Sequence, residues 1–187
     1  LVNVDASALV DSVADDPITT NANEANPTVL TLNGAADVVV TEANESITID
    51  ADALLTGTLE ITADDSGAPS DGDTLTVLTG SSDTTITALD SDDLLLVDSS
   101  EQVDTRRLTL VGAADVTVTH ANESITIDAD GLLTGTLTIT ADEDTSDLVG
   151  DTLTVLTGSN DTTVIDVNAK DSVWIDAGRM ADSVTGP

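Results

Sequence analysis

Apolar and polar residues alternate along much of the chain, in short runs separated by turn-forming residues. Such runs are typical of β-strands with one buried face, and the Gly, Asp, Asn and Ser between them are typical of tight turns. The runs that alternate or are rich in β-forming residues are 30–32, 38–41, 47–49, 58–62, 74–78, 84–87 and 94–97. Helical spacing is not sustained: 51–55 and 128–133 each fit a single helical turn, and 5–13 is the best remaining helix candidate. The pattern predicts an all-β protein.

A long internal duplication organises these strands. Leu30-Thr31-Leu32 recurs from Leu108, an offset of 78 residues, and the same offset carries 45–52 onto 123–130 without a gap. Long ungapped repeats mark arrays of stacked units. We therefore divide the chain into three parts, namely an N-terminal strand or linker segment (1–29), a first repeat unit (30–107) and a second unit with a degenerate end (108–187).

The two copies are expected to share one strand pattern. They diverge at 65–71 against 143–149. Divergence of this kind is typical of surface loops, so this stretch is expected to be the most mobile internal segment.

Two architectures fit such short strands. One is a parallel β-solenoid of the β-helix or β-roll kind, in which each turn stacks on the next around a thin aliphatic core. The other is a pair of tandem β-sandwich domains. The chain has one Trp and neither Phe nor Tyr, so its core must be built from Val, Leu, Ile and Ala. This composition, with identical residues stacking in register, favours the solenoid.

The charge balance is extreme, with 36 acidic residues against 4 basic ones and a net charge of −32. Such a charge pushes a compact fold apart unless cations or high ambient salt compensate it, and in a less apolar chain it would predict disorder. Nucleic acid is excluded as a partner because it needs basic patches. The chain has no cysteine and no run long enough for a membrane span. It begins at Leu1, and we expect it to be a piece of a larger protein.

The acidic side chains, mostly Asp, lie at strand ends and turns. Calcium takes about six to eight oxygen ligands from such flexible loops, and closely spaced carboxylates repel unless a cation lies between them. For any single Asp the alternative is a solvated surface residue. The predicted calcium ligands are Asp50, Asp52, Asp64, Asp73, Asp83, Asp93, Asp98, Asp128, Asp130, Asp142, Asp151, Asp161, Asp171, Asp176 and Asp182.

Several of these residues recur at the 78-residue offset, as Asp50 does at Asp128 and Asp98 at Asp176. If equivalent residues stack in successive turns about 4.8 Å apart, their charges repel. A divalent ion between them would then couple folding to metal binding. We therefore expect calcium to switch folding on outside the cell.

The segment 176–186 resembles the glycine- and aspartate-rich nonapeptide of RTX proteins, whose turns wrap calcium in a parallel β-roll. Gly178, Asp182 and Val184 match that motif, and two of its glycines are replaced here.

A second resemblance covers most of the chain. Leu-Thr-Leu-x-Gly-Ala-Ala-Asp-Val at 30–38 and 108–116, followed by Ser-Ile-Thr-Ile-Asp-Ala, is similar to strand repeats of bacterial surface-layer proteins and giant type I-secreted adhesins. That resemblance implies calcium-dependent folding outside the cell and self-assembly of identical subunits into a lattice or fibre.

The sequence contains few of the residues that usually carry out catalysis. His120 is the only histidine, and Glu42 replaces it in the first copy. Sugar-processing chemistry usually needs aromatic platforms, and only Trp174 is present. We expect no enzymatic activity. The sequence favours a structural, calcium-binding segment of an extracellular surface-layer, adhesin or fibre protein. The alternative is a non-catalytic calcium-binding secretion or binding module of a type I-secreted enzyme.

Overall fold

The structure of the chain is a computed structural model. It describes residues 2–6, 18–21, 29–41, 43, 46–63, 72–88, 90–121, 123–141, 150–166 and 171–178. The divergent stretch 65–71 and its counterpart 143–149 lie outside these ranges, so the expected mobility there stays a prediction.

The regular structure of the described residues consists of two parallel sheets. Sheet A contains, in order, β1 (Val2–Ala6), β3 (Val29–Gly34), β5 (Ile47–Leu54), β7 (Thr74–Leu78), β9 (Leu94–Asp98), β11 (Asp115–Thr119), β13 (Thr136–Ala141) and β15 (Asp161–Asp166). Sheet B contains β2 (Ile18–Asn21), β4 (Val38–Thr41), β6 (Thr58–Ala63), β8 (Asp83–Ala88), β10 (Arg107–Gly112), β12 (Thr126–Leu132), β14 (Thr152–Leu156) and β16 (Ser172–Asp176).

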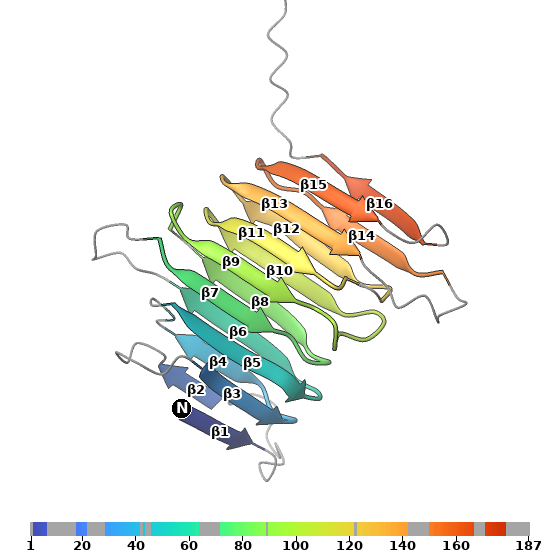
Figure 1. Cartoon of the computed structure of the whole chain (residues 1–187). Coiled ribbons are helices and arrows are strands. Elements are labelled where there is room, and N and C mark those ends of the chain that lie inside the picture. The colour runs from blue at the N-terminus through green and yellow to red at the C-terminus, as the bar shows by residue number, and fades with distance from the viewer. Residues whose placement is uncertain are drawn as a thin grey trace, which may run out of the picture.

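Successive strands alternate between the two sheets, so each turn of the chain adds one strand to each sheet. Every paired strand runs parallel to its neighbour, and Figure 1 shows the turns stacked from β1 and β2 at one end to β15 and β16 at the other. This is a β-solenoid, as predicted. Tandem sandwiches are wrong, because sandwich strands pair antiparallel within each sheet.

The core is a thin aliphatic layer between the sheets. In most strands between β3 and β14 alternate residues are buried, as in Leu75 and Val77 of β7. Parallel register places like residues above one another, so Ile61 pairs with Ile86 and Ile86 with Leu110. Most inward positions hold Leu, Ile, Val or Ala, because a Phe or Tyr ring would force the facing sheet away. Because these side chains are short, the two sheets lie close together and exclude water from the layer between them.

The single helical turns expected at 51–55 and 128–133 are wrong. Residues 51–54 and 128–132 continue β5 and β12. A β-bulge shifts the register at each place; next to β5, the shift lies between Thr31 and Asn33 of β3. Ala51 and Leu54 are both buried, while the two residues between them are exposed. The bulge thus produces a three-residue apolar spacing that imitates a helix. Of the candidate helix 5–13, residues 5 and 6 belong to β1, and the rest lies outside the described residues.

The duplication recurs strand by strand, as predicted. At the 78-residue offset β3 falls on β10, β6 on β13 and β9 on β16 with identical bounds. The predicted boundary at 107/108 falls inside β10, and both sheets run through it without a break.

One expectation about the repeat is wrong. A unit contributes seven strands, β3 to β9, and an odd number of strands moves each equivalent strand to the other sheet. Asp50 of β5 lies in sheet A, whereas Asp128 of β12 lies in sheet B. Residues equivalent by sequence therefore do not stack in successive turns, and the predicted repulsion between them does not arise in that form.

Two equivalent buried glycines, Gly80 and Gly158, lie where successive turns approach closely. A Cβ atom at Gly80 would lie 2.2 Å from the carbonyl oxygen of Ala51, and one at Gly158 would lie 2.1 Å from that of Leu132. Backbone atoms at this distance cannot move away without breaking the bulged strand beneath, so only glycine fits.

We expect Gly158→Ala to lower the free energy of unfolding by about 1–3 kcal/mol, the usual cost of overpacking. Gly80→Ala should behave alike, because the turn geometry repeats. Urea unfolding followed by circular dichroism measures both. The exposed neighbour offers the control, and Ser159→Ala should change stability by less than about 0.5 kcal/mol. Equal effects of Gly158→Ala and Ser159→Ala would contradict the close packing.

Candidate metal centre

The connections between strands form the two long edges of the solenoid. Connections from sheet A to sheet B, such as 99–106 and 120–125, lie on one edge, which we call the A-to-B edge. Connections from sheet B to sheet A, such as 89–93, lie on the other, the B-to-A edge. Acidic residues gather in both because turns are where Asp is favoured.

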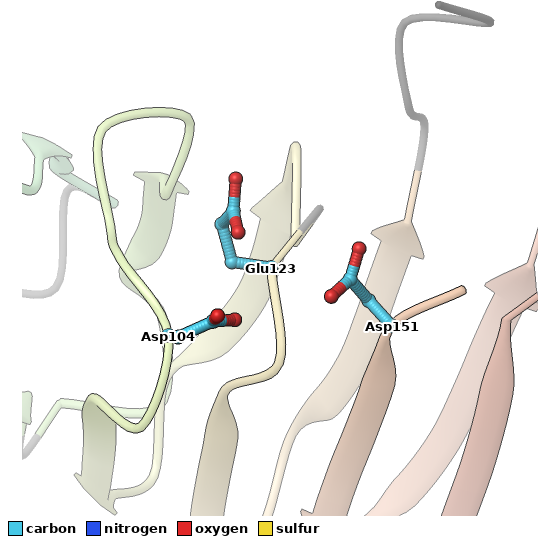
Figure 2. A group of neighbouring side chains, drawn as sticks. All are labelled: Asp104, Glu123 and Asp151. Atoms are coloured by element: carbon cyan, nitrogen blue, oxygen red, sulfur yellow. The ribbon is translucent and has the colours of Figure 1, made fainter. Parts of the chain in front are cut away.

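Among the described residues, one group of carboxylates is close enough to hold a metal ion. Asp104, Glu123 and Asp151 each offer an oxygen, and these oxygens lie within 4.8 Å of one another. They come from three consecutive turns on the A-to-B edge, and Figure 2 shows Asp104 and Asp151 on either side of Glu123. Asp104 is exposed, and the other two are half-buried. We call this group the acidic triad.

Ser124 fixes the positions of two members of the acidic triad. Its backbone N–H donates to Asp104 Oδ1 (3.1 Å), and its hydroxyl donates to Asp151 Oδ1 (2.8 Å). The same hydroxyl accepts the N–H of Thr152 (3.2 Å). Asp151 is tied on to the next turn, since its N–H donates to Asp171 Oδ1 (3.1 Å). A carboxylate has about four acceptor sites, so one such bond leaves each aspartate able to bind a cation.

The first copy contains the same arrangement on the opposite edge. Ser46 donates to Asp73 Oδ1 (2.8 Å) and accepts from the N–H of Thr74 (3.1 Å), and the N–H of Asp73 donates to Asp93 (3.2 Å). The positions that correspond to Asp104 and Glu123 are 26 and 45, an Asn and a Glu, and both lie outside the described residues. The set at 104, 123 and 151 thus has one more acidic residue than its counterpart at 26, 45 and 73.

The chemistry of the acidic triad suits a hard divalent cation. Three carboxylates supply only oxygen donors, which calcium and magnesium prefer, and neither thiolate nor imidazole belongs to the group. Two unit charges 4.8 Å apart repel by roughly 1 kcal/mol in water and roughly 3 kcal/mol at an effective dielectric constant of 20. A cation between them would replace this repulsion with attraction and join three turns.

Most of the predicted ligands lie elsewhere, and their hydrogen bonds serve the backbone. Of the predicted set only Asp151 belongs to the acidic triad. Four aspartates each accept the N–H of the residue two positions later, at 3.4, 3.0, 3.2 and 3.0 Å; they are Asp50, Asp98, Asp128 and Asp176. Asp98 and Asp176 end β9 and β16 and close a local turn there, which requires no metal. Asp50 and Asp128 lie within β5 and β12, beside the bulges.

Other predicted ligands connect neighbouring turns. Asp73, Asp93 and Asp171 belong to the serine-centred arrangements already described, and Asp83 accepts the N–H of Arg107 (3.0 Å) from the next strand of sheet B. Asp161 begins β15, and Asp130 lies in β12. Asp64, Asp142 and Asp182 lie outside the described residues. The role of each as a calcium ligand stays a prediction.

A second acidic group includes Asp52, Asp50, Asp98 and Glu101. Burial raises the pKa of the Asp52 carboxyl above its ordinary value, and the nearby charges of Asp50, Glu101 and Asp98 raise it further. Asp98 also contacts His120, with 3.0 Å between Oδ1 and Nδ1. Part of this group, Asp50, Asp52 and Asp98, was predicted from the Asp-x-Asp and strand-end patterns.

Asp104 and Glu123 were not among the predicted ligands. The predicted ligands were based on strand ends and Asp-x-Asp pairs, whereas Asp104 lies within a long connection and Glu123 precedes a strand. Two sequence signals were available, namely the Glu-Ser pair that recurs at 45–46 and 123–124, and the change from Asn26 to Asp104 between copies. Which turns become neighbours could be read only from the fold.

Within the described part of the chain, the structure contains no helix with the length and apolar character that a membrane crossing needs.

We expect Asp52→Asn to raise the melting temperature slightly at neutral pH without calcium. The raised pKa means that the fold favours the protonated carboxyl, so the charged form costs stability above the pKa of the folded state. The gain should shrink as the pH falls toward about 4, where Asp52 itself becomes protonated in both states. Thermal unfolding at several pH values measures it. Asp92→Asn, on the B-to-A edge, removes the same charge from an exposed loop and is the control. A gain of equal size in both variants would indicate a net-charge effect alone.

Comparisons of the chain with protein-family models, with curated proteins and with solved structures found no match. The resemblance to surface-layer, adhesin and RTX proteins therefore depends on the motifs quoted above. Any function has to be argued from the geometry of this chain.

Proposed function

We propose that the chain is a structural, calcium-binding segment of an extracellular surface-layer, adhesin or fibre protein. The observation that carries this proposal is the acidic triad, in which carboxylates from three consecutive turns of one solenoid converge. A cation at that place would connect turns that are otherwise joined by strand pairing and by the bonds of Ser124.

The rest of the described molecule suits a load-bearing role. Its sheets run through both repeat units without interruption, so tension along the solenoid is carried by backbone hydrogen bonds between every pair of turns. The proposed role requires no catalytic step.

Calcium is the cation we propose, for two reasons. The triad provides carboxylate oxygens on flexible connections, and calcium accepts irregular oxygen coordination, whereas magnesium needs a near-ideal octahedron. The remaining coordination sites would be filled by water and carbonyl oxygens. A site of this exposure suits millimolar calcium, the range of about 10⁻⁴–10⁻³ M typical of extracellular modules, and this supports an extracellular location.

The test is calcium binding by wild-type protein and by Asp104→Asn. The amide oxygen of Asn can still accept the N–H of Ser124, so this variant should fold, and it introduces the residue found 78 positions earlier, at Asn26. We expect calcium at about ten times its dissociation constant to stabilise the wild type by about 1.4 kcal/mol per site. Asp104→Asn should lose one bound calcium in isothermal titration calorimetry and the matching stabilisation.

The control is Asp90→Asn, which removes an equal charge from the B-to-A edge. If calcium raises the melting temperature of wild type, Asp104→Asn and Asp90→Asn equally, it acts by screening and the proposed site is wrong. The same holds if sodium chloride at equal ionic strength reproduces the effect.

A further inference from the structure

The outer face of sheet A is apolar at one place, on β9. This strand contains four consecutive apolar residues, Leu94 to Val97, and no other described strand contains so many. Leu95 and Val97 are buried at the inward positions, so Leu94 and Leu96 lie on the outer face. Leu94 is 38% exposed. Apolar residues on both faces of a strand are typical of a sheet that is covered on both sides.

A third leucine adjoins these two on the outer face. Leu78 of β7 pairs with Asp98 of β9, so it lies diagonally beside Leu96. The strand neighbours of Leu96 on either side are both threonines, the kind of residue that suits an exposed sheet surface. We call Leu78, Leu94 and Leu96 the leucine patch. It interrupts a surface that is otherwise mostly threonine and aspartate.

Carboxylates surround the leucine patch. In its row, Leu78 lies between Asp50 and Asp98, and Leu94 pairs with Asp115. The described strands of sheet A contain neither Lys nor Arg, so no long basic side chain of this sheet lies among these carboxylates. Contiguous apolar side chains with a polar rim are typical of a protein interaction site.

The second copy repeats the pattern on the outer face of sheet B. At the 78-residue offset Leu78 corresponds to Leu156 and Leu96 to Trp174. The pairing is the same, since Leu156 pairs with Asp176 on β16. Both outward positions therefore stay apolar, although one residue has changed from Leu to Trp. We call Leu156 and Trp174 the tryptophan patch.

We propose that each patch binds a basic polypeptide segment, in which apolar side chains are flanked by Lys or Arg. The apolar side chains would cover the leucines or the tryptophan, and the basic groups would lie against the surrounding carboxylates. Because a unit has seven strands, the two patches lie on opposite faces of the solenoid. One chain would therefore join two partner molecules.

Charge complementarity selects this partner over other occupants. A second copy of the chain carries a net charge of −32 and would bring carboxylates against carboxylates. An anionic membrane surface would be repelled in the same way. His120 contacts Asp98 at the rim of the leucine patch, and it offsets part of that charge only when it is protonated. On sheet B, Arg107 pairs with Asp128, so we expect the tryptophan patch to be the weaker site.

The inference goes beyond the proposed calcium-binding role and does not depend on it. The acidic triad lies on the A-to-B edge, and neither patch includes any of its residues. Binding is therefore measured in EGTA, where calcium cannot compete for the carboxylates.

The test uses the full chain and two synthetic peptides of about 14 residues. One is an amphipathic helix of Leu and Lys with Leu at helical spacing, and the other has Ser in place of every Leu and the same charge. Isothermal titration calorimetry should show two sites per chain for the Leu-Lys peptide, each at least about tenfold tighter than any site for the Ser-Lys peptide. The emission of Trp174, the only Trp, should shift to shorter wavelength with the Leu-Lys peptide alone.

Variants assign the two sites. Leu96→Thr gives β9 the residue that both its neighbours have in that row, so it should fold. It should weaken one site about tenfold and leave the shift of Trp174 unchanged, whereas Trp174→Thr should weaken the other site. Leu78→Thr is a second variant of the leucine patch in case Leu96→Thr does not fold. The control is Val39→Thr, which removes a single outward apolar side chain beside Glu60 and should change neither site.

Equal binding of the two peptides, or equal effects of Leu96→Thr and Val39→Thr, overturns the inference, because the acidic surface then binds any polycation. Self-association of the chain that Leu96→Thr abolishes also overturns it, since a second copy then covers the patch. A single site with no change in Trp174 emission overturns the bivalent arrangement. Two sites that persist in EGTA and in Asp104→Asn support the inference even if the acidic triad binds no calcium.

Discussion

Parallel pairing between successive turns is the constraint on which the rest of this structure depends. A strand such as β8 has a neighbour on both sides, β6 and β10, and its backbone bonds with both in one register. Each turn must therefore place a residue that can be buried, usually Leu, Ile, Val or Ala, at the same inward positions as the turn before it. A large ring at any of them would disturb every neighbouring turn. The aliphatic composition follows from this, since a layer of Leu, Ile and Val can be continued from turn to turn without adjustment.

The acidic residues are used in the turns because the pairing leaves backbone N–H groups there without a strand partner. Asp37 accepts both the N–H and the hydroxyl of Thr58 at 2.7 and 3.0 Å, and Asp115 does the same for Thr136 at identical distances. A carboxylate is a strong acceptor for such N–H groups. The net charge of −32 is a consequence of using carboxylates as these acceptors. Cations then become useful wherever carboxylates of neighbouring turns converge, as they do at Asp104, Glu123 and Asp151.

The sequence was sufficient for the strands and the solenoid, because period-two alternation and an ungapped repeat are local signals. The prediction from sequence failed at 51–55, because a β-bulge and a helical turn produce the same apolar spacing. Only the pairing with β3 distinguishes the two. The candidate metal site was harder to predict. Asp151 was predicted, but Asp104 and Glu123 were not, since 47 residues of chain separate the first of the triad from the last and nothing local says which turns adjoin. Sites made from neighbouring turns depend on the number of residues in each turn, and these turns vary.

The odd number of strands in a unit also decides on which edge equivalent acidic residues lie. With an even number, each copy would place its Ser-Asp arrangement on the same edge, and the carboxylates of all copies would line up in one row. With seven strands, Ser46 and Asp73 lie on the B-to-A edge, whereas Ser124 and Asp151 lie on the A-to-B edge. Equivalent charges are thereby separated by the width of the core as well as by several turns. Charge repulsion decreases with distance and is screened beyond about 8 Å at physiological salt, so equivalent carboxylates of the two copies contribute little repulsion in this arrangement. The carboxylates that do come close belong to neighbouring turns, as in the acidic triad.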